Sequence, residues 1–409
     1  MKVYNTYKFR MYPKPEQEEI LFRTIGAARK MYNLLLEGYN ANYSLYKSED
    51  ITRKEYTQSK NSINPVMFTR QEEYDYLSEV DSTALKYAHK HINRAFANFF
   101  AGHAKRPVFK SRNHSKWAYT TCRASKKSKN LRLAKNGWLY LPKMPKSPVK
   151  VVVSKNPVGT LVSATIEKTR SGKWFVSLRY EHHTKAPVYP KTIDEMTNPI
   201  GVDMGLKDLA ITSDGEFFAN LRHAYKAKKK LAQLDRLLSR KREQAKKDGR
   251  DLKDCKNYQK AKVKRARAYE KVRNQREDAL HKITTDLINN HDFIAVEDLS
   301  AENLKKNHKL AFAISDVSWH SFFTKLKYKA EKQGKIIQVI DRYYASTQIC
   351  SECESITGPK GFAELNIRQW DCPVCGAHHD RDVNSAVNIR DKGFEEFIAV
   401  GTTVGRTLQ

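Results

Sequence analysis

The chain has 409 residues, of which 40% are hydrophobic, and a formal net charge of +30 from 75 Lys and Arg against 45 Asp and Glu. This length predicts two or three domains; no apolar run is long enough to span a bilayer, and the first residues lack the apolar core of a signal peptide. We therefore expect a soluble cytoplasmic protein without a membrane partner, whose surplus of cations binds a polyanion.

The first hundred residues change from an alternating to a helical pattern. Residues 1–13 alternate in polarity and predict a strand, and a helix begins at Pro15, since proline suits the first helical position. A second helix begins near Asp81, whose side chain can cap its first turn. Apolar residues recur along one face of each helix, so residues 14–100 are expected to form a helical lobe inserted after the first strand.

Short strands dominate residues 101–184. β-Branched and aromatic runs such as VKVVVS and KWFVSLRYEH are separated by the turn signals NG, NP, VG and SG. We expect a strand-rich, barrel-like domain that also includes residues 1–13. Residues 185–198 contain prolines and few apolar side chains, and are expected to be a linker.

A long stretch without acids lies in this part of the chain. The 85 residues from 82 to 166 contain 18 Lys and Arg and no Asp or Glu. Phe109, Trp117 and Tyr119 are interleaved with the cations. Cations neutralise phosphates and aromatic faces stack on bases, which favours a nucleic-acid surface; the alternative is a solvated basic surface with these aromatics in a core. The candidate nucleic-acid contacts are Lys105, Arg106, Lys110, Arg112, Lys116 and Arg123.

Buried strands characterise the segment that follows. The run IGVDMG carries Asp203 between Gly201 and Gly205, where the backbone can approach a neighbour closely. DLAITSDGEFF predicts a hairpin that turns at its Asp-Gly pair. DFIAVEDL and KIIQVID predict two further strands, and Glu297 stands at the end of the first of them.

Residues 221–290 are helical in pattern and contain 23 Lys and Arg against 9 Asp and Glu. With the strands around them, they predict an α/β domain formed by residues 199–345 and 378–392. The tail, residues 393–409, has weak periodicity and is expected to be loosely ordered.

Four of the six cysteines have the spacing C-x2-C-x18-C-x2-C, and the other two lie far away. This pattern indicates one structural zinc site in a reducing compartment rather than a disulfide framework. His378 and His379 could also bind a metal, but four thiolates already complete a tetrahedral shell. The predicted zinc ligands, in a ribbon of residues 346–377, are Cys350, Cys353, Cys372 and Cys375.

Three acids stand at ends of predicted elements: Asp203 and Glu297 on strands and Asp382 at the start of a helix. An acid at such a place is usually a cap or a surface charge. Together the three resemble the arrangement of RNase-H-like folds, in which carboxylates meet over a central sheet. Their repulsion would be relieved by two Mg²⁺ ions, which favour oxygen ligands and can stabilise both oxygens of a phosphodiester displacement.

The order of these motifs resembles that of a known family. The segments that carry the resemblance are YKFRMYPKPEQEEILFRTIGAARKMYN, GVDMGLKDLAITSDG, IAVEDLSAENLKKN, SDVSWHSFFTKLKYKA, STQICSEC and CPVCGAHHDRDVNSAVNIR. They resemble the TnpB (OrfB) family of transposon-encoded proteins, which is related to type V CRISPR effectors, over residues 4 to 390.

The resemblance implies a multidomain α+β protein. Its parts would be an RNase-H-like (RuvC) α/β nuclease domain with a zinc-ribbon insertion, a strand-rich wedge barrel and an inserted helical recognition lobe. Asp203, Glu297 and Asp382 match the three catalytic acids by position. The implied activity is RNA-guided cleavage of double-stranded DNA beside a short flanking motif, with guide RNA and target DNA as partners at the prokaryotic nucleoid.

Two alternatives remain open from the residues. One is a transposase or resolvase that uses the same acids without a guide. The other is a non-catalytic RNA-guided regulator that only binds DNA. A local choice also remains between Asp380 and Asp382: we expect Asp382 to be the metal ligand and Asp380 to cap the helix or to pair with Arg381. The oligomeric state is not predicted.

Overall fold

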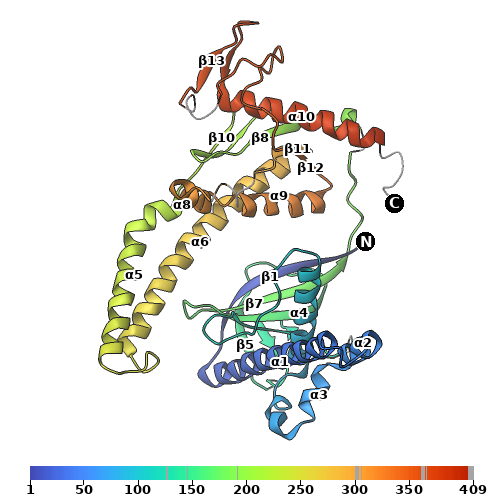
Figure 1. Cartoon of the computed structure of the whole chain (residues 1–409), viewed down its shortest axis with the longest axis vertical. Coiled ribbons are helices and arrows are strands. Elements are labelled where there is room, and N and C mark those ends of the chain that lie inside the picture. The colour runs from blue at the N-terminus through green and yellow to red at the C-terminus, as the bar shows by residue number, and fades with distance from the viewer. Residues whose placement is uncertain are drawn as a thin grey trace. The chain divides into compact units, whose positions relative to one another are not determined.

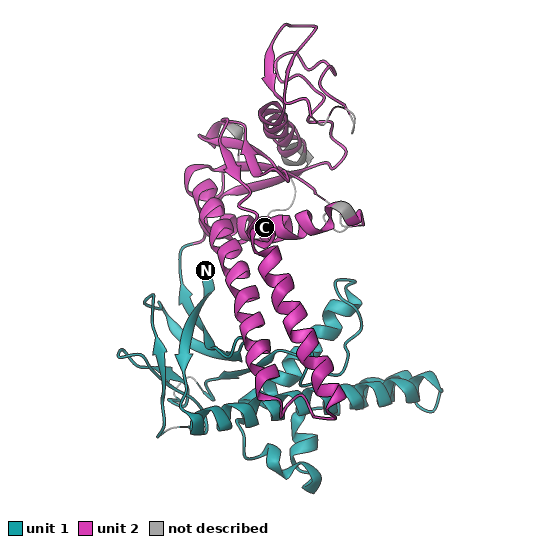
Figure 2. Cartoon of the chain, turned by 90° about the vertical axis from the view of Figure 1, so that its left-hand side faces the viewer, with its two compact units in different colours: residues 1–185 teal, residues 186–409 magenta. Residues whose placement is uncertain are grey.

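The structure is a computed structural model whose two compact units are Met1–Lys185 and Ala186–Gln409 (Figure 2). It describes residues 1–403 except 126–127, 145, 191, 300–303, 305, 361–363 and 365. Each unit contains its own sheet and its own buried apolar clusters. Among the described helices, none is long and apolar enough to cross a membrane.

Unit 1 is built on a seven-stranded antiparallel sheet in the order β2-β6-β7-β1-β5-β4-β3. The strands are β1 (Lys2–Tyr12), β2 (Trp117–Cys122), β3 (Arg132–Leu133), β4 (Trp138–Tyr140), β5 (Val149–Val152), β6 (Thr160–Lys168) and β7 (Trp174–His183). β1 pairs with both β5 and β7, so the helical segment is an insertion between strands of one sheet. The expected strand-rich, barrel-like domain is confirmed in part: the strands form one sheet, but β2 and β3 lie at its two ends and do not pair in the described part, so the sheet is not a closed barrel.

The inserted helices are α1 (Pro15–Lys47), α2 (Arg53–Ser62), α3 (Pro65–Thr69) and α4 (Ser82–Phe100), with a 3₁₀ turn at Glu72–Leu77. Pro15 begins α1, and the Asp81 carboxylate accepts a 2.9 Å hydrogen bond from the Thr83 N–H, so both predicted helix starts are confirmed. Leu21 and Ile25 of α1 pack into the sheet core, whereas the second half of α1 forms a separate cluster with α4. The first half of α1 therefore shares a core with the strands, and the rest of the helical insertion has a core of its own.

Unit 2 contains a five-stranded sheet in the order β10-β9-β8-β11-β12. The strands are β8 (Pro199–Asp203), β9 (Asp208–Thr212), β10 (Phe217–Ala219), β11 (Phe293–Glu297) and β12 (Ile336–Ile340). β8, β11 and β12 are parallel to one another, while β9 and β10 add an antiparallel hairpin that turns at Gly215, as predicted. The backbones of β8 and β11 are in register from Pro199↔Phe293 to Val202↔Val296, which brings their carboxyl ends to the same edge.

Helices cover both faces of this sheet (Figure 1). They are α5 (His223–Lys247), α6 (Lys256–Asn290), α8 (His308–Val317), α9 (Trp319–Gln333) and α10 (Arg381–Thr403). Alternate residues of β11 point to opposite sides: Ile294 pairs with the cluster of α6, α8 and α9, and Phe293 with that of α10. Phe394 of α10 stacks on Phe293 at 4.6 Å.

The expectation of a loosely ordered tail is wrong as far as Thr403. α10 continues to this residue because Phe394 and Phe397 add a second apolar contact to the sheet beyond Ile389. Residues 404–409 lie outside the described part. The expected linker contains a 3₁₀ turn at Ile193–Glu195 and the buried Met196, so its end already belongs to the core of unit 2.

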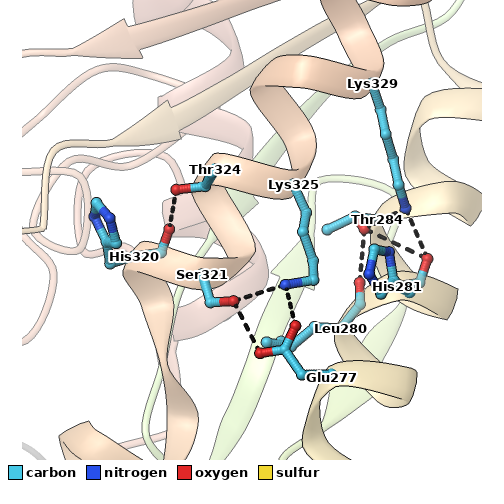
Figure 3. Close-up of polar contacts among 9 residues, drawn as sticks. All are labelled: Glu277, Leu280, His281, Thr284, His320, Ser321, Thr324, Lys325 and Lys329. Atoms are coloured by element: carbon cyan, nitrogen blue, oxygen red, sulfur yellow. Dashed lines mark hydrogen bonds and ion pairs between the residues drawn. The ribbon is translucent and has the colours of Figure 1, made fainter. Parts of the chain in front are cut away.

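A polar cluster is buried between α6 and α9 (Figure 3). Lys325 is 7% exposed, and its ammonium donates to the Glu277 carboxylate at 2.6 Å and to the Ser321 hydroxyl at 2.7 Å. The Lys329 ammonium donates to the His281 carbonyl and to the hydroxyls of Thr284 and Thr285, at 2.7–2.8 Å. Burial and the nearby Lys325 lower the pKa of Lys329 to about 8.

Candidate active site and metal centre

Close contact between α10 and β8 brings the predicted acids together. A Cβ at Gly201 would lie 1.9 Å from the Ala386 carbonyl oxygen and 2.7 Å from the Arg390 nitrogen. Only glycine therefore allows the helix backbone to lie against the strand backbone at this point. Asp203 follows Gly201 by two residues, and Asp382 precedes Ala386 by one helical turn, so the same contact controls the approach of both acids.

The acids influence one another electrostatically. Burial raises the pKa of Asp203 well above its ordinary value, and the negative charges of Glu297 and Asp382 raise it further. Burial also raises the pKa of Glu297, against a 2.7 Å hydrogen bond from the Ser346 hydroxyl that lowers it. Protein atoms surround the Asp203 and Glu297 side chains closely, but part of the surface of each residue is accessible to solvent. The sequence-predicted trio is thus gathered at the carboxyl edge of β8 and β11 and remains accessible.

Asp382 has a cationic partner in the structure. Its carboxylate is 2.6 Å from the Arg368 guanidinium. Among the described residues, the four cysteines are the only metal-type ligands whose donor atoms all lie within 4.8 Å of one another, so the three carboxylates are spaced more widely than that. The ion pair with Arg368 supplies a positive charge to Asp382 from outside the trio.

Asp380 has a different role. Its carboxylate accepts hydrogen bonds from the N–H groups of Asp382 and Val383, at 3.0 and 3.1 Å, and so caps α10. The capping role expected for Asp380 is confirmed. The expected pairing with Arg381 is not found, since that guanidinium donates to the Glu364 carbonyl at 3.1 Å.

The carboxylate donor set fits Mg²⁺. Carboxylate oxygens are the ligands that this ion prefers, and it normally needs only one or two of them beside substrate oxygens and water. A divalent cation would also remove the like-charge repulsion that raises the pKa of Asp203.

The four cysteines form a second, compact centre beside the two-stranded ladder of β13 (Gln369–Asp371) and β14 (His378–Asp380). Cys350 and Cys375 have sulfurs 3.7 Å apart, as have Cys353 and Cys372. Zn–S bonds of about 2.3 Å in a tetrahedron separate sulfurs by about 3.8 Å, so the spacing fits zinc.

Neighbouring polar groups support this centre. The Thr357 hydroxyl, 3.3 Å from the Cys372 sulfur, lowers the pKa of that thiol to about 5. The Ser355 hydroxyl lies 2.9 Å from the Cys353 sulfur and lowers its pKa as well. His379 contacts the Cys350 sulfur at 3.1 Å as an outer partner. Thiolates bind metal, so these contacts favour the binding form of Cys372 and Cys353, whereas in the metal-free protein burial raises the pKa of Cys350.

The segment that leads into the ribbon is hydrogen-bonded to α10 by two asparagines whose contacts the sequence analysis did not predict. Asn384 donates to the Ile349 carbonyl at 2.7 Å and accepts from the Ser351 N–H at 2.9 Å. Asn388 also donates to Ile349, at 2.7 Å. One signal could have identified them: two asparagines spaced four apart, and so on one face of the predicted helix.

The candidate nucleic-acid contacts lie in unit 1 and differ in exposure. Lys105, Arg106, Arg112 and Lys116 are exposed, while Arg123 is half-buried and donates to the Ser128 carbonyl at 3.2 Å. Lys110 is a different case, because its ammonium lies 3.6 Å from the centre of the Tyr32 ring and burial lowers its pKa.

The three aromatic residues interleaved with these cations are not equivalent. Tyr119 is 5% exposed and lies in the sheet core, so the core interpretation holds for it. Trp117 packs against Phe22 and donates to the Arg112 carbonyl at 2.8 Å. Phe109 is 57% exposed and is free to stack on a base.

Three family profiles match the chain. Residues 319–389 match the "Cas12f1-like, TNB domain", which covers the cysteine centre and Asp382. Residues 177–308 match OrfB_IS605, described as "Probable transposase", which covers Asp203 and Glu297. Residues 1–48 match a "Helix-turn-helix domain" of OrfB_IS605; here they form one strand and one long helix.

Whole proteins match over nearly the full length. A Streptomyces pristinaespiralis protein named "Putative RNA-guided DNA endonuclease" is 36% identical over 96% of this chain and 90% of its own length. An Escherichia coli K12 protein named "Putative RNA-guided DNA endonuclease InsQ" is 29% identical over 100% and 97%.

A solved structure shares the fold. A Cas12f1 chain, from a complex with sgRNA and target DNA, has a TM-score of 0.60 at 13% identity and covers 95% of this chain and 99% of its own. The chain thus has the multidomain α/β fold of that effector, with a strand-rich sheet and a ribbon-like TNB domain. It belongs to the TnpB (OrfB) family of IS605 transposons.

Proposed function

We propose that this protein is a transposon-associated, RNA-guided and Mg²⁺-dependent DNA endonuclease. The observation that carries the proposal is the meeting of Asp203 and Glu297 at the carboxyl ends of two parallel strands, with Asp382 brought to them by α10. That the guide is RNA and the substrate is DNA is inferred from the names of the relatives that match over nearly the whole chain.

The strand order supports an RNase-H-like (RuvC) assignment for the nuclease domain, residues 199–345 and 378–392. Three antiparallel strands followed by two parallel ones, flanked by helices on both faces, provide the platform on which such carboxylates meet. The remaining parts would be a wedge (1–13 and 101–184), a recognition lobe (14–100) and a zinc ribbon (346–377).

In this mechanism Asp203, Glu297 and Asp382 would hold two Mg²⁺ ions, which would supply an activated water and charge stabilisation for the phosphodiester displacement. The Ser346 hydroxyl orients Glu297, and Arg368 balances the charge of Asp382 in the metal-free protein. The four cysteines would hold a zinc ion with a closed shell, which would stabilise the ribbon and leave no position for water.

The exposed cations of unit 1 and the basic helices α5 and α6 would neutralise nucleic-acid backbones. Base pairing with the guide would supply sequence recognition, and the protein would recognise the shape of the heteroduplex and a short flanking motif.

The test is to express the protein beside its native flanking DNA, sequence the RNA that copurifies, and offer the complex a matching DNA target with Mg²⁺. We expect one defined RNA and metal-dependent cleavage only of DNA that matches it. Cleavage by RNA-free protein would favour the guide-independent enzyme, and guided binding without cleavage would favour the regulator.

A further inference from the structure

We propose that Ser346 is a positioning residue for Glu297, and that the stem of the ribbon, defined as residues 346–350, couples the cysteine centre to this acid as well as to Asp382. The inference rests on the proposed function, because it assigns Glu297 to a metal. It adds a residue outside the three acids and the four cysteines.

The hydroxyl of Ser346 is committed to one direction of hydrogen bonding. It lies 2.7 Å from Glu297 Oε1 and 3.0 Å from the Ser385 hydroxyl. A hydroxyl has one proton, so Ser346 donates it to the carboxylate and accepts from Ser385. Ser346 is 4% exposed and Ser385 is fully buried, so water has little access to either group.

The backbone of the stem is fixed by the same helix. The Ser346 carbonyl accepts from the Asn388 amide at 2.8 Å, and the Ile349 carbonyl accepts from Asn384 and Asn388, each at 2.7 Å. Both asparagines are at least nine-tenths buried. The stem thus lies between α10 and the end of β11, and it cannot shift without losing these bonds.

This arrangement has two consequences. Holding Oε1 restricts rotation of the Glu297 carboxylate before a cation arrives, and partners of this kind typically contribute 10- to 100-fold to metal affinity. The stem ends at Cys350, so metal binding at the cysteines also restricts the motion of the stem. This restriction is passed to Glu297 by the Ser346 hydrogen bond and to Asp382 by the contacts with α10.

Ser346→Ala tests the first consequence. Mn²⁺ binding to the zinc-loaded full-length chain, followed by electron paramagnetic resonance of the free ion, should weaken roughly tenfold. In cleavage assays the half-saturating Mg²⁺ concentration should rise to a similar extent, and the rate should recover in part at high Mg²⁺. Ser351→Ala is the matched control, because its backbone N–H rather than its hydroxyl contacts α10, and its Mn²⁺ affinity should equal that of the wild type.

Zinc content and the thermal unfolding midpoint of each variant separate positioning from folding. Weaker Mn²⁺ binding with full zinc and an unchanged midpoint supports the inference. Unchanged Mn²⁺ affinity in Ser346→Ala, while Asp203→Ala loses it, overturns the role of Ser346 alone. Retained Mn²⁺ affinity in Asp203→Ala overturns the metal site and hence the proposed function as well.

Discussion

Two polar clusters of unit 2 differ in how their charges are balanced. Between α6 and α9, the Lys325 ammonium has the carboxylate of Glu277 at 2.6 Å. At the carboxyl edge of the sheet, burial raises the pKa of both Asp203 and Glu297, and the negative charge of Glu297 raises that of Asp203 further. In the first cluster the charge of Lys325 is compensated within the protein by Glu277. In the second, Arg368 pairs with Asp382, but the like-charge repulsion that raises the pKa of Asp203 remains, as is typical of a cation-binding site.

The largest expected effect comes from Asp203→Asn, which keeps the shape of the side chain and removes one negative charge from the three acids. Cleavage should fall by roughly 10³-fold or more, because the acid holds metals that supply several kcal/mol of transition-state stabilisation. The metal-free variant should nevertheless unfold at a higher temperature than the wild type, since a buried and repelled carboxylate has been neutralised.

The pH dependence of this gain has a defined sign. The folded protein binds the Asp203 proton more tightly than the unfolded chain does, so ionisation lowers wild-type stability as the pH rises through the raised pKa. The advantage of Asp203→Asn should be largest near neutral pH and should shrink in acid. An advantage that grows on acidification would contradict the assignment.

Removing metal from the cysteine centre should have the next largest effect. Cys372→Ser should lose zinc, soluble yield and cleavage together, because binding energy at a closed site contributes to folding. Cys255→Ser, at an isolated cysteine, is the control and should retain all three. Active wild-type protein with less than one zinc per chain by elemental analysis would be inconsistent with this account.

Removing Glu277 should lower the free energy of unfolding more than removing Lys325. Glu277→Ala leaves the ammonium of Lys325 buried without its counter-charge, and should lower the free energy of unfolding by about 3 kcal/mol. Lys325→Met should cost only about 1 kcal/mol, since the side chain of Glu277 is 40% exposed and can be hydrated. Chemical denaturation measures both; equal losses would show that burial does not control the pair. Neither change should alter Mn²⁺ binding.

The smallest effect is expected for Asp380→Ala, and its comparison with Asp382→Ala distinguishes the two neighbouring acids. Asp380→Ala removes the cap of α10 and should lower the free energy of unfolding by about 1 kcal/mol while keeping some Mg²⁺-dependent cleavage. Asp382→Ala should abolish cleavage and keep guided DNA binding. If Asp380→Ala is inactive and Asp382→Ala still cleaves, the wrong carboxylate has been assigned.

The sequence predicts those parts of unit 2 whose pattern is local. The buried strands at Asp203 and Glu297, the Asp-Gly hairpin and the spacing of the cysteines are all confirmed, because each depends on a short run of residues. Gly201 was correctly expected to allow a neighbouring segment to approach the backbone closely, although only the structure identifies α10 as that segment.

The parts that the sequence misses depend on contacts between distant segments. Ser346 lies 49 residues from Glu297, and Arg368 lies in a loop that no periodicity connects to Asp382. The same holds for Tyr119, whose burial depends on the register of β2 against β6. The helical tail was missed because Phe394 and Phe397 are too few to give a clear period, but they find an apolar surface on β11.

The central claim is that Asp203, Glu297 and Asp382 form the metal site of the nuclease. Anomalous scattering from Mn²⁺-soaked crystals of the zinc-loaded protein tests it most directly, with data collected at the manganese and zinc edges. The account predicts manganese between the carboxylates of Asp203, Glu297 and Asp382, and zinc among the four cysteine sulfurs. Manganese bound elsewhere, with none at the three acids under conditions that support cleavage, would contradict it.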